Sequence, residues 1–342
     1  MFIRQKTLDD LLFDVFSKLL KSKNPVKATR GSTFELFGVI LELSNPRARL
    51  SRTETKGTIF SCLGELLWYI SGSNDLSFIK HYIKRYEDDS EDGKTIYGAY
   101  GPRLLKQDGH INQIKNVIEI LSLKETSRRA VIQIFDSSDI DSYHKEIPCT
   151  CNLQFIVRKG KLNMLTHMRS NDAFFGLPHD IFSFTMLQEI IARSLNIEVG
   201  IYKHSVGSLH IYENYVEKAK QFIDEGFQSS KPMPSMPIGD PKKSIEKLLK
   251  VEQNIRSKNI CYDGSEELEP YWTDLALLLS IFNISKQIDN DHSTEIERLK
   301  NLISSDTYKI YIEKRQQSFT KAKIPVQLPL DNRKNNSKCS HE

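Results

Sequence analysis

The segment from 147 to 180 constrains the fold most, because it is typical of two adjacent strands followed by a helix. Residues 147–157 are rich in β-branched, aromatic and other apolar side chains, and residues 162–168 repeat that composition after a turn at Lys159 to Lys161. This spacing predicts an antiparallel hairpin, which brings Arg169 back towards Cys149. A guanidinium beside a thiol favours the reactive thiolate, so the pair suits nucleophilic chemistry.

The charge and cysteine content exclude several classes of protein. The chain has 48 basic and 44 acidic residues and a net charge of +4, without a dominant basic block, so we expect no nucleic-acid or membrane surface. Apolar runs stay short of membrane length, and we expect a cytoplasmic protein. An odd, scattered set of cysteines without zinc-finger spacing argues against a disulfide framework and a zinc site: Cys62, Cys149, Cys151, Cys261 and Cys339.

Helical and strand patterns together predict an α+β fold with a helical C-terminal extension. The expected helices lie at 8–20, 58–72, 111–121, 181–195 and 213–225, and the further strands at 34–43 and 130–135. We expect residues 1–225 to form a catalytic domain, and four prolines make 226–243 a connection. Beyond it, Ser244 is the expected cap of a helix at 245–255. Further helices are expected at 271–284, 296–303 and 308–312 of an extension spanning 244–330, before a disordered tail at 331–342.

Several polar residues have an ordinary structural interpretation from the pattern alone. Glu65 lies in an apolar helical run, and its expected place there is the solvent side. Asp180 stands near the entry of a helix, where an N-cap is expected. Arg30 lies in a polar loop, and Arg128 with Arg129 precedes a strand; such residues bind phosphate or are simply solvated.

Taken together, the motifs resemble the thymidylate synthase family over roughly residues 25 to 225. The matching pieces occur in collinear order: Glu65-Leu66-Leu67-Trp68, Tyr97-Gly98, Ser127-Arg128-Arg129, Pro148-Cys149 with Gln154-Phe155, Arg169-Ser170 with Asp172, Gly176 and Pro178, and Gly207 with His210-Ile211-Tyr212. The resemblance implies a mixed β-sheet packed with helices. It also implies one-carbon transfer from 5,10-methylenetetrahydrofolate to C5 of a pyrimidine nucleoside monophosphate, in a homodimer and without a metal.

The resemblance assigns a role to each matching residue. Cys149 would add to C6 of the pyrimidine and so make C5 nucleophilic, while Glu65 and Tyr97 would handle protons at the base. The implied substrate-binding residues are Arg30, Arg169 and Ser170 at the phosphate, Arg128 and Arg129 from the partner subunit, His210 and Tyr212 at the sugar hydroxyl, and Gln154. Asp172 and Gly176 would line the folate side.

Asp180 departs from the family pattern, because the synthases carry Asn at this position. Asn donates to O4 of uracil and accepts from N3–H, whereas Asp180 can accept from the N4 amino group of cytosine and share a proton with N3. One lost hydrogen bond in a closed site costs roughly 1 to 3 kcal/mol, about tenfold to hundredfold in discrimination. Asp180 is thus both a catalytic and a substrate-binding candidate, and the chain resembles the hydroxymethylase branch of the family.

Three other departures accompany Asp180. Thr150 replaces the His that commonly follows the nucleophile, and residues 101–103 lack the usual Trp-Arg pair. The chain ends on Lys338-Cys339-Ser340-His341-Glu342 instead of a short apolar segment that closes over folate. Without that closure, water can capture the transferred carbon and give a hydroxymethyl product.

The sequence therefore favours hydroxymethylation of dCMP, or of CMP. One alternative is a thymidylate synthase that methylates dUMP. Another is a catalytically silent, nucleotide-binding regulatory relative whose C-terminal helices dock a partner.

Overall fold

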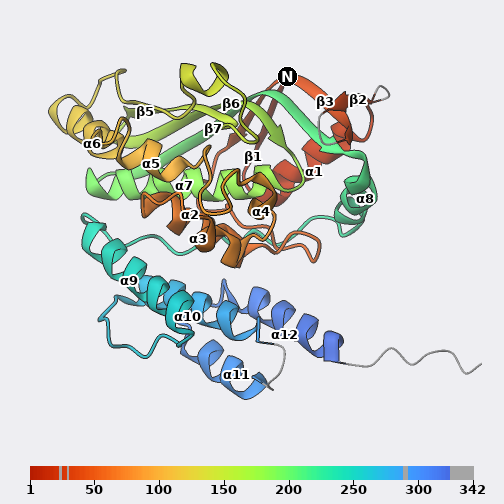
Figure 1. Ribbon diagram of the computed structural model, residues 1–342, viewed down its shortest axis with the longest axis vertical. Coiled ribbons are helices and arrows are strands. Elements are labelled where there is room, and N and C mark those ends of the chain that lie inside the picture. The colour runs from red at the N-terminus through yellow and green to blue at the C-terminus, as the bar shows by residue number, and fades with distance from the viewer. Residues whose placement is uncertain (23–24, 29–30, 288–291, 324–342) are drawn as a thin grey trace, which may run out of the picture.

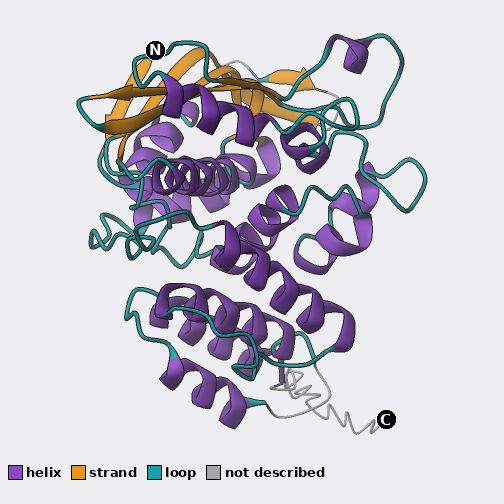
Figure 2. Ribbon diagram, turned by 90° about the vertical axis from the view of Figure 1, so that its left-hand side faces the viewer, coloured by secondary structure: helices purple, strands orange, loops and turns teal. Residues whose placement is uncertain are grey.

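The computed structural model describes residues 1–22, 25–28, 31–287 and 292–323. A β-sheet forms one side of the molecule, a layer of helices lies against it, and the C-terminal helices lie beyond that layer (Figures 1 and 2). The predicted α+β class is confirmed.

The described residues form one seven-stranded mixed sheet with the order β1-β3-β7-β6-β5-β4, and β2 pairs with β3. The β1–β3 and β6–β7 pairs are parallel and the others antiparallel. The strands are β1 (Phe2–Gln5), β2 (Val26–Ala28), β3 (Gly31–Leu43), β4 (Val131–Gln133), β5 (Thr150–Arg158), β6 (Lys161–Asp172) and β7 (Glu198–Tyr212).

The predicted hairpin is present as β5 and β6. Its two turn residues, Lys159 and Gly160, have φ angles of 54° and 66°, as a type I′ turn requires. The register pairs Arg158 with Lys161 across the turn. Alternate residues Leu153, Phe155 and Val157 are buried, so one face of the hairpin enters the core.

Helix α7 (Gly176–Ser194) lies against β6 and β7 and also packs on α2 (Ile59–Ile70). The opposite face of the sheet stays open at β3, where Phe37 is 87% exposed and Ile40 is 40% exposed. Helix α1 (Leu8–Leu19) begins at Thr7, whose side chain accepts a hydrogen bond from the backbone N–H of Asp10. These helices agree with the sequence prediction, apart from the start of α7.

The remaining helices of the first 225 residues are short. They are α3 (Leu76–Tyr82), α4 (Tyr86–Asp89), α5 (Tyr100–Leu105), α6 (Gln113–Leu123), α8 (Val216–Asp224) and the 3₁₀ turns η1 (Ser137–Ile140) and η2 (Glu213–Tyr215). The sequence pattern predicted α6 and α8 but not α3, α4 or α5, because helices of four to seven residues show too little periodicity.

The C-terminal region contains α9 (Lys242–Lys258), α10 (Pro270–Ile284), α11 (Ser293–Leu302) and α12 (Lys309–Lys323). Helix α10 is apolar around its circumference because it packs on α2, α9 and α11. The predicted Ser244 cap is wrong, since α9 already begins at Lys242 after Pro241. The disordered tail expected at 331–342 lies outside the described residues.

A buried ion pair between Arg49 and Glu189 fixes the segment that joins the two regions. Glu189 also accepts the backbone N–H of Met236 at 3.1 Å, and Arg193 donates to the Met236 carbonyl at 2.9 Å. Residues 226–241 therefore run along α7 instead of hanging free.

Candidate active site

Cys149 lies directly before β5, and Arg169 of β6 holds the backbone around it. The Arg169 N–H donates to the Cys149 carbonyl at 2.9 Å. Its guanidinium donates to the carbonyls of Pro148 and Ile147 at 3.0 and 3.1 Å. The predicted approach of Arg169 to the Cys149 backbone is therefore present, and Cys149 is only partly buried, as an attacking thiol requires.

Tyr100 interacts electrostatically with both Cys149 and Asp180, and its place in the site was not predicted from the sequence. Its buried phenol oxygen accepts hydrogen bonds from the N–H and Oγ1 of Thr150 at 3.2 and 3.0 Å. Burial first, and then the charges of Asp180 and Cys149, raise the pKa of Tyr100 well above its ordinary value. Its phenol therefore remains protonated beside the thiol and the carboxyl.

Tyr97, the tyrosine that the resemblance assigns to proton transfer, lies in a different environment. The residue is 37% exposed, and its ring stacks on that of His144 with the ring centroids 3.5 Å apart. The catalytic role of Tyr97 stays a prediction.

Asp180 is a buried residue of the second turn of α7. The helix begins at Gly176 after Phe175, so the interpretation of Asp180 as its N-cap is wrong. Pro178 is tolerated in the first turn, because the N–H that proline lacks has no partner there. Asp180 Oδ2 accepts a hydrogen bond from Asn171 at 2.8 Å. Burial, and then the charge of Glu65, raise the pKa of Asp180 to about 8.

Glu65 is also buried, and its expected place on a solvated helix face is wrong. Only 5% of the residue is exposed, and its Oε1 accepts from the Tyr86 hydroxyl at 2.6 Å. Other helices cover α2 on nearly every side, which a single amphipathic pattern does not reveal. Glu65 therefore faces the polar interior that contains Asp180.

Two further buried side chains extend from Asp180 through Asn171. Asn171 Oδ1 lies 2.9 Å from His204 Nε2, and His204 Nδ1 lies 2.7 Å from the Tyr202 hydroxyl. Burial lowers the pKa of His204 to about 3, so its imidazole is neutral. No sequence pattern predicted this group, because its members come from three elements that meet only in the folded protein.

The ends of β6 and β7 bring together four of the predicted residues. The register pairs Asp172 with His210, and Ser170 with Ser208 two residues earlier. The rings of His210 and Tyr212 pack edge to face, with their centroids 5.3 Å apart. Asp172 caps the following turn by accepting from the Phe174 N–H at 2.8 Å.

Gly176 is required for close packing at this position. A Cβ added there would lie 2.9 Å from Asn171 Nδ2 and 3.4 Å from Asp180 Oδ2. The absence of a side chain thus lets the first turn of α7 pack against the Asn171–Asp180 hydrogen bond.

Arg128 and Arg129 lie away from Cys149 of the same chain. The carbonyl of Arg128 accepts from Gln154 at 3.3 Å, and Gln154 is five residues beyond Cys149, about 17 Å along the strand. Both arginines are exposed and border a hollow of about 710 Å³ that is lined by Ile120, Leu123, Lys124, Thr126, Ser127, Arg128, Arg129 and Arg158. Arg30 lies outside the described residues.

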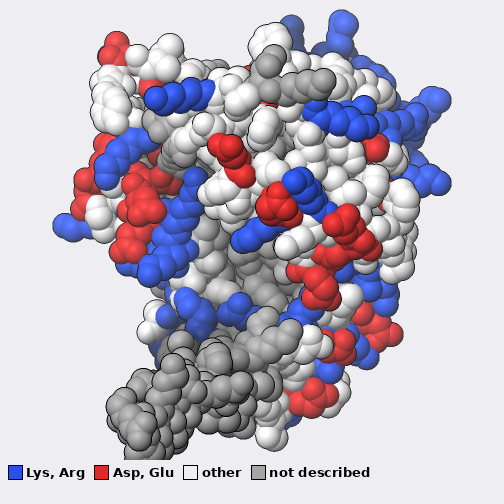
Figure 3. Space-filling model, turned by 90° about the vertical axis from the view of Figure 1, so that its right-hand side faces the viewer, with Lys and Arg blue, Asp and Glu red and all other residues white. Residues whose placement is uncertain are grey.

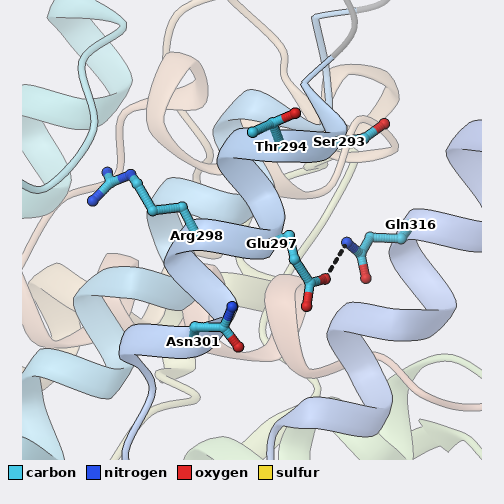
Figure 4. A pocket seen from close by; sticks show the side chains of 6 residues that line it. All are labelled: Ser293, Thr294, Glu297, Arg298, Asn301 and Gln316. Carbon is cyan, nitrogen blue, oxygen red and sulfur yellow. Dashed lines mark hydrogen bonds between the residues drawn. The ribbon is translucent and has the colours of Figure 1, made fainter.

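A second hollow, of about 600 Å³, lies between α11 and α12 (Figure 4). Its Glu297 accepts from Gln316 at 3.2 Å, and its Arg298 pairs with Glu295. Because these charges are already paired and the hollow lies in the C-terminal helices, we do not assign it to the site around Cys149.

The described residues contain no membrane-spanning helix and no candidate metal site, and one face of the molecule carries both charges. None of the described helices is long and apolar enough to cross a membrane. In the same part of the chain, no group of three or more His, Cys, Asp and Glu residues could hold a metal ion. Acidic and basic side chains are interspersed on the face that Figure 3 displays.

Comparison with known proteins identifies the family. The family model described as thymidylate synthase matches residues 9–258. The thymidylate synthase of Buchnera aphidicola subsp. Acyrthosiphon pisum is 30% identical over 215 residues, 61% of this chain and 81% of that protein. The crystal structure of thymidylate synthase from T4 phage matches with a TM-score of 0.58 and 25% identity, over 72% of this chain and 92% of that chain. The resemblance is therefore confirmed, and the chain belongs to the thymidylate synthase family of one-carbon transferases.

Proposed function

We propose that this enzyme hydroxymethylates C5 of a cytidine monophosphate, with dCMP as the substrate. The observation that carries the proposal is a buried carboxyl, Asp180, where the synthases have an amide. Because its pKa is raised to about 8, this carboxyl is neutral at pH 7 and has one donating and one accepting oxygen. With the accepting oxygen opposite N4 and the hydroxyl opposite N3, both polar groups of the cytosine edge are paired.

Cys149 is the proposed nucleophile. Its sulfur would add to C6 of the base, so that electron density moves to C5, the atom that receives the one-carbon unit. Arg169 supports this role, because it fixes the backbone at 147–149 and its positive charge favours the thiolate. We assign Glu65, Tyr97 and Tyr100 to the protons of the reaction, and Ser170, His210 and Tyr212 to nucleotide binding. Gln154 lies beside Arg128, and its role in nucleotide binding stays a prediction.

The side of the site next to Asp172 suits an aromatic, anionic co-substrate such as 5,10-methylenetetrahydrofolate. Phe175 is 38% exposed there, and the Lys56 ammonium lies 3.5 Å from the centre of the Phe174 ring. Burial lowers the pKa of Lys56 to about 7, and Asp172 opposes that shift. We propose that Asp172, Gly176 and Phe175 hold the folate, which supplies the one-carbon unit when bound.

We propose that the C-terminal helices support the folate side of the site. Lys314 of α12 donates to the carbonyls of Arg52 and Thr53 at 2.9 and 2.8 Å, and so fixes the loop that carries Lys56. We therefore propose a catalytic domain over 1–225, a connection over 226–243 and a helical extension over 244–330.

We also propose that the enzyme is a homodimer in which Arg128 and Arg129 bind the phosphate in the partner's site. Their distance from Cys149 along β5 and the exposed Phe37 on the open face of the sheet support this arrangement.

The dimer predicts complementation between two inactive variants. Mixing Cys149→Ala with Arg128→Ala/Arg129→Ala subunits, after unfolding and refolding together, should restore about a quarter of the wild-type activity, since half of the dimers are mixed and each has one complete site. If the mixture stays inactive while gel filtration shows mixed dimers, the arginines do not act across the interface.

Methylation of dUMP is the second candidate, because the two relatives described above are named thymidylate synthases. The two functions separate when dCMP, CMP and dUMP are each supplied with methylenetetrahydrofolate. Our proposal expects a hydroxymethylated product from dCMP without dihydrofolate, and none from the Cys149→Ala variant. Product from dUMP alone, together with dihydrofolate, would establish methylation instead.

A further inference from the structure

Four buried side chains form a continuous series of hydrogen bonds that ends at the carboxyl of Asp180. They are Tyr202 and His204 of β7, Asn171 of β6 and Asp180 of α7. The three bonds measure 2.7, 2.9 and 2.8 Å in that order. Tyr202 and His204 are fully buried and Asn171 is 4% exposed, so water does not compete for these bonds.

The hydrogen bonds from Tyr202 to Asp180 all donate in the same direction. Asn171 turns its Nδ2 to Asp180 and therefore its Oδ1 to His204. A neutral imidazole has a single N–H, and this Oδ1 requires it on Nε2. Nδ1 of His204 then accepts, so Tyr202 donates its hydroxyl proton. All three hydrogen bonds consequently point towards Oδ2 of Asp180.

We propose that Tyr202, His204 and Asn171 are positioning residues that keep Oδ2 of Asp180 an acceptor, so that the site reads cytosine and rejects uracil. The carboxyl proton then resides on Oδ1. Oδ2 lies opposite the N4 amino group, and the Oδ1 hydroxyl lies opposite N3. Uracil in the same place would set O4 against an acceptor and N3–H against a donor. This inference rests on the proposed function, because it assumes a base at Asp180.

The packing around Asn171 supports a fixed amide. Gly176 leaves no space between the start of α7 and Asn171 Nδ2, where an added Cβ would lie at 2.9 Å. The other charged and titratable groups that interact with Asp180 come from the surrounding elements: Glu65 and Tyr69 of α2, Tyr86 of α4, Tyr100 of α5, Asp172 of β6 and His179 of α7. Asn171 donates the hydrogen bond that Oδ2 of Asp180 accepts.

A double-mutant cycle tests the positioning role. In Asp180→Asn, the N–H of Asn171 still demands an oxygen at the Oδ2 position, so the new amide keeps its NH₂ opposite N3 and binds dCMP better than dUMP. In Asp180→Asn combined with Asn171→Leu, the amide can turn, and the ratio of dCMP to dUMP affinity should fall by about tenfold, the scale of one hydrogen bond in a closed site. Calorimetric binding measures the ratio even where turnover is lost.

Two tyrosine variants refine this test. Tyr202→Phe in the Asp180→Asn background should lower the ratio in the same direction but by less, because it removes only the terminal donor. Tyr271→Phe is the matched control, since this buried hydroxyl contacts Met186 at 3.8 Å and lies outside the series. Inversion of the preference by Asp180→Asn alone, or equal ratios in the single and double variants, would overturn the inference.

A second measurement needs no substrate. ¹⁵N NMR of histidine-labelled protein, with His204→Gln to assign the signal, should show His204 as the neutral Nε2–H tautomer, and Tyr202→Phe should populate the other tautomer. An Nδ1–H tautomer or an imidazolium in the wild type would overturn the direction of the series. The predicted tautomer in an enzyme that uses only dUMP would instead contradict the proposed function and leave the direction of the series intact.

Discussion

The pH dependence of dCMP turnover follows from the ionisation of Asp180. The proposed pairing with cytosine requires a neutral carboxyl, and burial together with the charge of Glu65 raises its pKa to about 8. Since the pKa is raised, the required form is fully present at low pH and is lost as pH rises through about 8. One pH unit above the pKa costs about 1.4 kcal/mol relative to the fully neutral carboxyl, so kcat/KM for dCMP should be about tenfold lower at pH 9 than at low pH, and about fivefold lower at pH 9 than at pH 8.

This prediction can be separated from other titrations by a variant. In Asp180→Asn the alkaline decrease in kcat/KM should disappear, because an amide does not ionise. His179 also titrates in this pH range, because the neighbouring Cys62 and Glu65 overcome the effect of burial and raise its pKa to about 9. Its titration remains in Asp180→Asn, so the variant separates the two groups. Initial rates with dCMP from pH 6 to 10 give the profile. The reasoning fails if the decrease near pH 8 is the same in the wild type and in Asp180→Asn.

Three further results are expected. Gly176→Ala should force Asn171 away from Asp180 at a cost of about 1 to 3 kcal/mol, measured by urea unfolding, and should reduce the preference for dCMP; an unaffected preference would show that the hydrogen bond tolerates the methyl group. Arg49→Met should leave Glu189 charged and unpaired in the core and destabilise the fold by about 3 to 5 kcal/mol, whereas a Tm equal to that of the wild type would contradict the importance of the pair. The stability of the wild type should decline as pH rises from about 4 to 8, because folded Asp180 keeps its proton above the ordinary pKa of 3.8; Asp180→Asn should remove part of that slope in thermal melts.

Features that depend on neighbouring residues in the chain could be predicted from the sequence. The hairpin of β5 and β6 followed from strand composition and a turn at Lys159 and Gly160, and it correctly placed Arg169 beside Cys149. Helices α1 and α2 followed from their apolar spacing. Strands β5 and β6 lie side by side because a two-residue turn joins them, so their pairing follows from neighbouring residues.

Features that depend on tertiary packing could not be predicted in this way. Glu65 appeared solvated because the sequence does not reveal which helices cover α2. Asp180 resembled a cap because Pro178 marked a helix start that lies two residues earlier in the structure. The hydrogen bond between Asn171 and His204 forms only because β6 and β7 pair in parallel, so neither residue stood out in the sequence.

The central claim is that the buried carboxyl of Asp180 selects cytosine for C5 hydroxymethylation. A direct competition tests it: equimolar dCMP and dUMP are incubated with the enzyme and methylenetetrahydrofolate, and the nucleotides are identified by mass spectrometry. We predict that 5-hydroxymethyl-dCMP accumulates at least about tenfold faster than any product of dUMP, the discrimination expected from one mismatched hydrogen bond. Accumulation of dTMP with unchanged dCMP would contradict the claim.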